Sequence, residues 1–350
     1  MSDWPRDWHG RKLAFTTSIP VEVLVAAGAA PVDLNNVFIT SPDPARLVAQ
    51  AEQAGLPRTV CGWVKGIYAA ALAADDLAAI IAVTQGDCSN THALIELFQY
   101  QGRRVVPFAY PYDRSRAALA VEVEKLLRIF GVTYDQVLET KRRLDDIRRV
   151  LLRVDELTWR EGTVTGEENH RFLVSASDFN GDPDRFEAEV EAFVQEAKER
   201  TPAPEGLRLG YLGVPPIWDD FYEVVEGLGA RIVFNEMQRQ FAMLPSVEGE
   251  GGEHDGPAED ALLNQYLRYT YPYDVFSRIE DIRREVRRRR LDGLIHYVQS
   301  FCFRQMEDLL LRKEVGLPVL TLEGDRPGPV DASTHTRIES FREMLPTRSP

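Results

Sequence analysis

The sequence predicts an α/β protein built from two domains, each formed around a parallel sheet. Two distant segments share the succession of apolar run, polar turn, helical pattern and apolar run that defines a βαβ unit. They extend over residues 77–108 and 294–322. The length of the chain agrees with two domains, because 350 residues exceed what one compact core usually holds. Repeated βα alternation favours parallel sheets covered by helices.

The first unit begins at residues 77–83 (LAAIIAV), an apolar run typical of a strand buried on both faces. A turn at residues 84–88 follows, and Ser89 and Asn90 then open a helical pattern that ends at Gly102. Residues 104–108 (RVVPF) supply the next predicted strand.

The second unit repeats this order near the other end of the chain. Residues 294–298 (LIHYV) lead into a turn at residues 299–302, a helical pattern up to Gly316, and a strand at residues 318–322. Both turns contain the sequence Gln-x-x-Cys, as Gln85 to Cys88 and as Gln299 to Cys302. The shared position in the unit indicates an internal pseudo-repeat.

A third βαβ unit without a cysteine is predicted from strands at residues 207–212 and 230–234, with a helix at 218–227 between them. Residues 21–27 predict a further helix, which Ser18 and Pro20 suit as start signals.

Residues 117–159 have the charged, helix-periodic pattern of helices that pack across or between domains. We therefore expect two Rossmann-like domains joined by helical segments. The expected division is an N-terminal α/β domain at residues 1–115, a helical connecting region at 116–205 and a C-terminal α/β domain at 206–350. Residues 201–206 predict a linker, and the acidic, Gly-rich residues 248–260 predict a surface loop.

The composition excludes several classes of function. A net charge of -14 argues against a nucleic-acid-binding protein, because such proteins neutralise phosphates with Lys and Arg. The sequence contains no signal-peptide pattern and no run long enough for a membrane helix, so a cytoplasmic protein is expected. The basic residues 283–290 are expected to form a solvated helix face, with anion or partner binding as the alternative.

The three cysteines, Cys61, Cys88 and Cys302, are the main candidates for a functional site. Ligands of open parallel sheets gather at the carboxyl ends of the strands, where both Gln-x-x-Cys turns lie. Cys61 precedes a helical stretch at residues 62–72, and a helix N-terminus favours the thiolate that binds metal. We expect all three cysteines to converge in the cleft between the domains.

Zinc is disfavoured as the ligand of these cysteines, because structural zinc sites usually contain a close pair such as C-x-x-C. Three separated thiolates suit a 4Fe-4S cluster that keeps one iron without a protein ligand. Three buried cysteines without a cluster remain the alternative.

Other polar residues near the turns are weaker candidates for chemistry. Ser89 and Gln85 would tune a cluster by hydrogen bonds and Arg304 by its charge, while His92 and Glu96 would carry protons. A solvated helix face is the preferred explanation of His92 and Glu96. His296 lies in an apolar run and is expected to be a hydrogen-bonded core residue. The sequence has no G-x-G-x-x-G or Walker motif, so an ATPase activity of its own is not expected.

Several segments together resemble one family. They are TTSIPVEVLVAAGAAPVDLNN at residues 16–36, CGWVKG at Cys61, GDCSNTHAL at Cys88, HYVQSFCFRQMEDLLL at Cys302, and the closing PVLTLEGD and TRIESF. They resemble the 2-hydroxyacyl-CoA dehydratase D-component family, which includes benzoyl-CoA reductase subunits and double-cubane cluster proteins. The resemblance covers most of the chain, and the order of the three single cysteines makes it specific.

The resemblance implies a 4Fe-4S cluster on Cys61, Cys88 and Cys302, or an 8Fe double-cubane cluster. It implies a lyase that removes water from an (R)-2-hydroxyacyl-CoA thioester through a ketyl radical. The electron would come from a separate ATP-hydrolysing activator with its own cluster, and the chain would form a homodimer or a heterodimer with a related subunit. A low-potential reductase or electron-transfer protein of the double-cubane or benzoyl-CoA reductase type, or a non-catalytic cluster-bearing subunit, remains the alternative.

Overall fold

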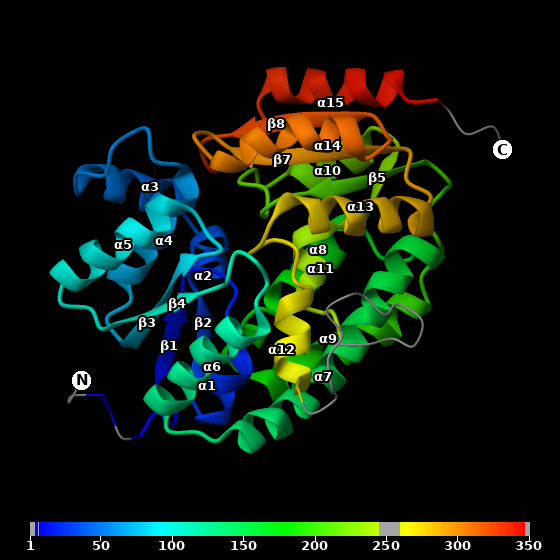
Figure 1. Cartoon of the computed structure of the whole chain (residues 1–350). Helices are drawn as coiled ribbons and strands as arrows, with labels where there is room; N and C mark the ends of the chain where they lie inside the picture. Colours follow the sequence, from blue (N-terminus) through cyan, green and yellow to red (C-terminus); the bar gives the residue numbers. More distant parts are fainter. Residues whose placement is uncertain (1–3, 6, 245–259, 347–350) are drawn as a thin grey trace.

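The computed structural model describes residues 4–5, 7–244 and 260–346. Within these ranges the strands form two four-stranded sheets, and all neighbouring strands are parallel (Figure 1). The α/β class with two parallel sheets is therefore confirmed. The loop expected at residues 248–260 lies outside the described residues, except for Asp260.

The first sheet has the strand order β2-β1-β3-β4. Its strands are β1 (Lys12–Phe15), β2 (Ala30–Asp33), β3 (Leu77–Gln85) and β4 (Val105–Ala109). The interior strand β3 buries residues 79–83, which explains its nearly unbroken apolar sequence. The register pairs Phe15 with both Asp33 and Ile81, so β1, β2 and β3 reach the same edge of the sheet.

The second sheet has the corresponding order β6-β5-β7-β8. Its strands are β5 (Leu207–Leu212), β6 (Ala230–Asn235), β7 (Gly293–Gln299) and β8 (Val319–Gly324). Strands β3 and β7 occupy the same position in their sheets, and each is followed by a cysteine, Cys88 or Cys302. This equivalence supports the pseudo-repeat expected from the two Gln-x-x-Cys turns.

Five helices belong to the first part of the chain. They are α1 (Val21–Ala26), α2 (Leu34–Ile39), α3 (Pro44–Gln53), α4 (Gly62–Ala73) and α5 (Ser89–Tyr100). Asp33 and Asp43 accept hydrogen bonds from backbone N–H groups and thereby cap α2 and α3. Cys61 and Cys88 occupy the N-cap positions of α4 and α5, which places both sulfur atoms at helix N-termini.

The connecting region is helical, as its periodicity predicts. Gly131 has φ 70 and ends the first helix, and Thr133 and Gln136 form a capping box that starts the second. The region contains α6 (Arg116–Phe130), α7 (Tyr134–Glu156), the π-helical turn η1 (Leu157–Glu161), α8 (Gly166–Ser175), the 3-10 turn η2 (Phe179–Gly181) and α9 (Pro183–Lys198).

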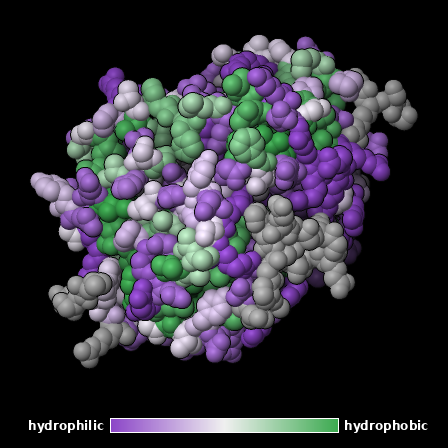
Figure 2. Space-filling view, viewed as in Figure 1, coloured by the Kyte–Doolittle hydropathy of each residue, from purple (hydrophilic) through white to green (hydrophobic). Residues whose placement is uncertain are grey.

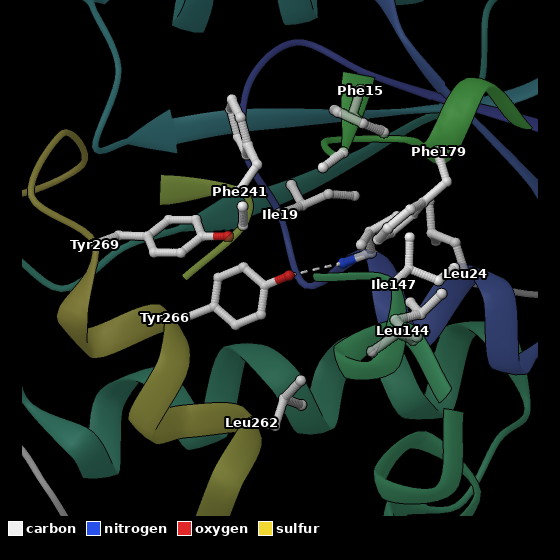
Figure 3. Packing of buried hydrophobic residues seen from close by; sticks show 14 of the residues in the cluster. Phe15, Ile19, Leu24, Leu144, Ile147, Phe179, Phe241, Leu262, Tyr266 and Tyr269 are labelled. Atoms are coloured by element: carbon white, nitrogen blue, oxygen red, sulfur yellow. Dashed lines mark hydrogen bonds between the residues drawn. The ribbon is translucent and has the colours of Figure 1, made fainter. Parts of the chain in front are cut away.

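These connecting helices share one hydrophobic core with the first sheet. Phe15 of β1 belongs to the same buried cluster as Leu144 and Ile147 of α7 (Figure 3). Tyr266 joins this core, and its hydroxyl oxygen accepts a hydrogen bond of 3.2 Å from the backbone N–H of Val21. The domain boundaries at residues 115 and 205 stay a prediction.

The helices of the second part pack around the second sheet, except for α12, which packs on α6 and α7. They are α10 (Phe221–Gly227), α11 (Glu236–Gln240), α12 (Ala261–Arg268), α13 (Val275–Arg289), the 3-10 turn η4 (Phe303–Glu307), α14 (Asp308–Glu314) and α15 (Ala332–Met344). Helix α10 begins at Phe221 rather than at the predicted Trp218, because Trp218 forms a parallel bridge with Gly328.

The basic segment 283–290 is not a uniformly solvated helix face. Arg289 is buried and donates hydrogen bonds to Asp155 at 2.5 Å and to Glu285 at 2.6 Å. Arg278 and Asp281 lie on the same inward face of α13, two turns and one turn before Glu285. The expectation is therefore wrong for Arg289, whose charge is neutralised by pairing inside the protein. Among the described residues, no helix combines the length and apolar character that crossing a membrane requires.

Candidate functional site

The carboxyl edges of the two sheets face one cavity of about 80 Å³. Residues at the ends of β1, β2 and β3 line it from the first sheet, and residues after β5, β6 and β7 line it from the second. The lining includes Thr16, Ser18, Asp33, Trp63, Val64, Val214, Met237, Phe241, Tyr271 and Gln299. This position is where parallel α/β sheets commonly bind ligands.

Cys61, Cys88 and Cys302 all line this cavity, and all three are free thiols. Two of them come from the first part of the chain and one from the second. The structure thus brings together the three cysteines that the sequence singles out. What these cysteines bind stays a prediction.

Each thiol lies at the start of a helical segment, near backbone N–H groups. Cys88 accepts a hydrogen bond of 3.4 Å from Thr91, and the nearby backbone N–H groups of Val64 and Arg304 act to lower the pKa of Cys61 and Cys302. These contacts favour the thiolate, but burial has the larger effect and raises the pKa of all three thiols. The pKa of Cys61 rises to about 12, and Cys88 and Cys302 add to the increase.

Gly62 allows the two halves of the chain to approach each other beside Cys61. A Cβ atom at Gly62 would lie 2.5 Å from the backbone oxygen of Asp325 and 2.9 Å from the Cδ1 atom of Ile217. Trp63 packs in a hydrophobic cluster that also contains Ile217 and Tyr297 of the second half. The third thiol is therefore held opposite the first two by direct packing between the halves.

A buried charge network fixes the turn that carries Cys302. The Arg278 guanidinium donates hydrogen bonds to Glu236 at 2.6 and 2.7 Å and to Glu307 at 2.6 Å. Arg304 donates to Glu307 at 2.8 Å and to the backbone oxygen of Tyr271, and its guanidinium lies 3.8 Å from the centre of the Tyr271 ring. Arg304 is thus a fixed positive charge within electrostatic reach of Cys302.

A pair of carboxyl groups, of which one lines the cavity, is a feature that the sequence did not reveal. The backbone N–H of Asp33 donates a hydrogen bond of 2.8 Å to the Asp178 carboxylate. Burial and the neighbouring Asp33 raise the pKa of Asp178 to about 7, and burial also raises the pKa of Asp33. Asp33 ends β2 and lines the cavity, whereas Asp178 comes from the connecting region. Their separation in the chain gave no local signal for this pair.

The family model described as 2-hydroxyglutaryl-CoA dehydratase, D-component, matches residues 16–345. The chain belongs to this family. The match includes strands β2 to β8 and all three cysteines, so the resemblance that the sequence motifs carry is confirmed. The chain is accordingly a component of the 2-hydroxyacyl-CoA dehydratase type. A comparison with curated proteins found no match.

The other residues that the sequence suggested for chemistry do not line the cavity of this D-component chain. Helix α5 exposes Ser89, His92 and Glu96 to solvent. This agrees with the solvated helix face expected for His92 and Glu96. Gln85 is exposed, whereas its counterpart Gln299 is buried at the cavity. The core position expected for His296 is confirmed, because His296 is buried with its Nδ1 atom 2.9 Å from Asp308 Oδ1.

The cavity of this D-component chain reaches the surface beside Cys302. Phe303 lines the cavity and is nevertheless 46% exposed. Phe301 and Met306, which flank it in sequence, are 58% and 81% exposed. Phe301 also has φ 65, a conformation that costs energy for an aromatic residue. The turn around Cys302 thus presents apolar side chains to solvent.

Proposed function

We propose that this chain is the cluster-bearing component of a 2-hydroxyacyl-CoA dehydratase. Cys61, Cys88 and Cys302 would together hold one 4Fe-4S cluster. The observation that carries this proposal is the meeting of these three distant thiols at one cavity between the carboxyl edges of two parallel sheets.

The residues at the cavity fit such a group. No three His, Cys, Asp or Glu side chains of the described residues are grouped around a single metal-ion position. A cluster needs its thiolates spread around a larger body. Trp63 Nε1 and Gln299 Oε1, both in residues that line the cavity, are buried without hydrogen-bond partners. The Trp63 N–H would be a donor to a cluster sulfide.

When bound, such a cluster supplies a low-potential electron and a Lewis-acidic iron that has no protein ligand. The chain itself excludes water from the site with the apolar side chains of Val64, Met237 and Phe241. Arg304 would hold its positive charge near the site, because Glu307 and Tyr271 fix its guanidinium.

Asp33 is the proposed proton donor. Loss of a hydroxyl group as water requires a proton, and burial raises the pKa of Asp33, while the pKa of the neighbouring Asp178 is raised to about 7. Only Asp33 of the two lines the cavity, so its carboxyl would face the substrate. Thr16 and Ser18 would orient the substrate by hydrogen bonds, because they line the cavity next to Asp33.

The electron would be delivered by a separate ATP-hydrolysing activator, as the family resemblance implies. The substrate would be a 2-hydroxyacyl-CoA thioester, and the active form would be a dimer with a second copy or a related subunit. The exposed apolar turn at Phe301, Phe303 and Met306 lies where the cavity meets the surface, which suits a face that a partner covers.

The test is anaerobic reconstitution with iron and sulfide, followed by assay with a panel of 2-hydroxyacyl-CoA thioesters and a matched activator. We expect about four irons per chain and ATP-dependent dehydration. About eight irons, with reduction of a substrate in place of dehydration, would favour the double-cubane reductase type. A chain that binds iron but turns over no thioester would be a non-catalytic subunit. A colourless protein without iron or sulfide would refute the proposal.

A further inference from the structure

A second cavity, of about 750 Å³, lies at the opposite end of the second sheet from Cys302. It is lined by the first residues of β5, by Gly229 and Arg231 at β6, and by the ends of α13 and α15. Because the strands are parallel, their starts lie on the edge remote from the cysteine cavity. The two cavities share no lining residue.

Basic residues outnumber acidic ones in the lining of this cavity, in an otherwise acidic protein. Seven arginines and three glutamates line it, although the whole chain has a net charge of -14. Arg289 is already paired with Asp155 and Glu285, so a ligand would meet the remaining arginines. Figure 2 shows hydrophilic side chains gathered over the C-terminal end of α13, from which three of the arginines come. Cations at a helix C-terminus interact favourably with the helix dipole, which accounts for part of this charge. Arg208, Arg231 and Arg342 belong to other elements and need a different explanation.

A neutral group orients one of these arginines. Arg231 donates a hydrogen bond of 2.7 Å to the backbone oxygen of Thr158. A carbonyl oxygen positions a guanidinium without cancelling its charge. Burial lowers the pKa of Arg231, and the attraction of Glu226 does not compensate for it. An anion in the cavity would therefore stabilise the Arg231 cation.

Gly162 packs closely against the Arg231 guanidinium. It has φ 78, and a Cβ atom there would lie 3.0 Å from Arg231 Nη1. Trp159, also in the lining, has a buried Nε1 atom without a hydrogen-bond partner, and its ring lies 4.9 Å from the Arg160 guanidinium and 5.3 Å from that of Arg288. Arg290 ends α13 with φ 52, a conformation at which glycine is usual.

We propose that this cavity binds a small molecule with two or more phosphate groups, at a site separate from the cysteine cavity. Arginine guanidiniums match phosphate oxygens with paired hydrogen bonds, and several of them suit more than one phosphate group. The volume is in the range of pockets that hold nucleotide-sized ligands. The phosphates have two sources, a free nucleotide or polyphosphate, and the nucleotide part of coenzyme A.

The test is isothermal titration calorimetry of the full chain with sodium pyrophosphate, ADP and coenzyme A. Arg231→Gln and Arg342→Gln each remove one charge from the cavity, and we expect each to weaken binding about tenfold or more. Arg342 is exposed, so its replacement does not endanger folding. Arg283→Gln is the matched control, since Arg283 is an exposed arginine of α13 outside the cavity and pairs with Glu314.

The site would be established for free phosphates if pyrophosphate and ADP bind the unmodified chain and Arg283→Gln but neither of the two cavity variants. Binding of coenzyme A alone, with the same dependence on Arg231 and Arg342, would assign the site to the nucleotide part of coenzyme A. The proposal is overturned if none of the three probes binds, or if all three variants weaken binding equally.

Discussion

Gly62 packs directly against the backbone oxygen of Asp325. A Cβ atom added at Gly62 would lie only 2.5 Å from that oxygen. Gly62 is the first residue of α4 and follows Cys61. Close contact between the two halves of the chain therefore depends on a residue next to a proposed ligand.

We predict that Gly62→Ala destabilises the protein and impairs the cysteine cavity. Alanine normally stabilises a helix relative to glycine, but here it must displace Asp325 or Ile217, at a cost of about 1–3 kcal/mol. Denaturant unfolding and iron content after reconstitution measure the two effects. Gly227→Ala in α10 is the control, because no atom lies within 4 Å of its added Cβ. Equal stability of the two variants would contradict the proposed contact.

A second prediction concerns the cysteines themselves. Cys61→Ser, Cys88→Ser and Cys302→Ser should each reduce bound iron from about four per chain to a small fraction of it, because three thiolates are the fewest that hold the proposed cluster. Ser89→Ala, next to Cys88 but exposed and outside the cavity, should leave the iron content unchanged. Full iron binding by any one of the serine variants would remove that cysteine from the ligand set.

The carboxyl pair predicts how stability depends on pH. The pKa of Asp178 is raised to about 7 in the folded chain, from 3.8. The folded state therefore binds more protons than the unfolded state between these values, and its free energy of unfolding falls as pH rises from about 4 to about 7. Unfolding by urea at several pH values measures this slope.

Asp178→Asn should make that slope shallower, since it removes the titrating group while keeping its shape. Asp33→Asn should do the same, because it removes the negative charge that helps to raise the pKa of Asp178. The two carboxyls titrate as one pair, so the double variant should change the slope by less than the sum of the single changes. Additive changes would show that the groups titrate independently.

The buried network around Arg278 yields a prediction of stability. Arg278→Met leaves the buried Glu236 without its cation, which should cost about 3–5 kcal/mol of unfolding free energy. Arg283→Met on the same helix breaks only the exposed pair with Glu314 and should cost about 0–1 kcal/mol. Chemical denaturation of both variants provides the comparison. A small loss in Arg278→Met would mean that the network does not hold the turn that carries Cys302.

Sequence patterns predicted the elements with strong local signals. The buried strands β3 and β7 were recognisable because both faces of each are covered, and helix α7 because its apolar side chains repeat at helical spacing. The strands β1 and β2 escaped prediction, since each has only four residues and β1 lies between polar residues.

The site was predictable in part for a related reason. Cys88 and Cys302 follow strands, and the carboxyl ends of parallel strands have a known direction, so their convergence could be anticipated. Contacts between residues that are far apart in the sequence could not be anticipated. Asp178 approaches Asp33 from another region of the chain. Arg289 is buried because Asp155 lies opposite it, and the run of arginines in the sequence gave no sign of this pairing.

The division of the thiols, two on one half of the chain and one on the other, has a mechanical consequence. A cofactor held by Cys61, Cys88 and Cys302 would add a cross-link between segments that are otherwise joined by packing, hydrogen bonds and ion pairs. Oxygen damage to it would then weaken the contact between the halves as well as destroy the chemistry. Resistance of the whole chain to proteolysis would report how much cofactor it carries.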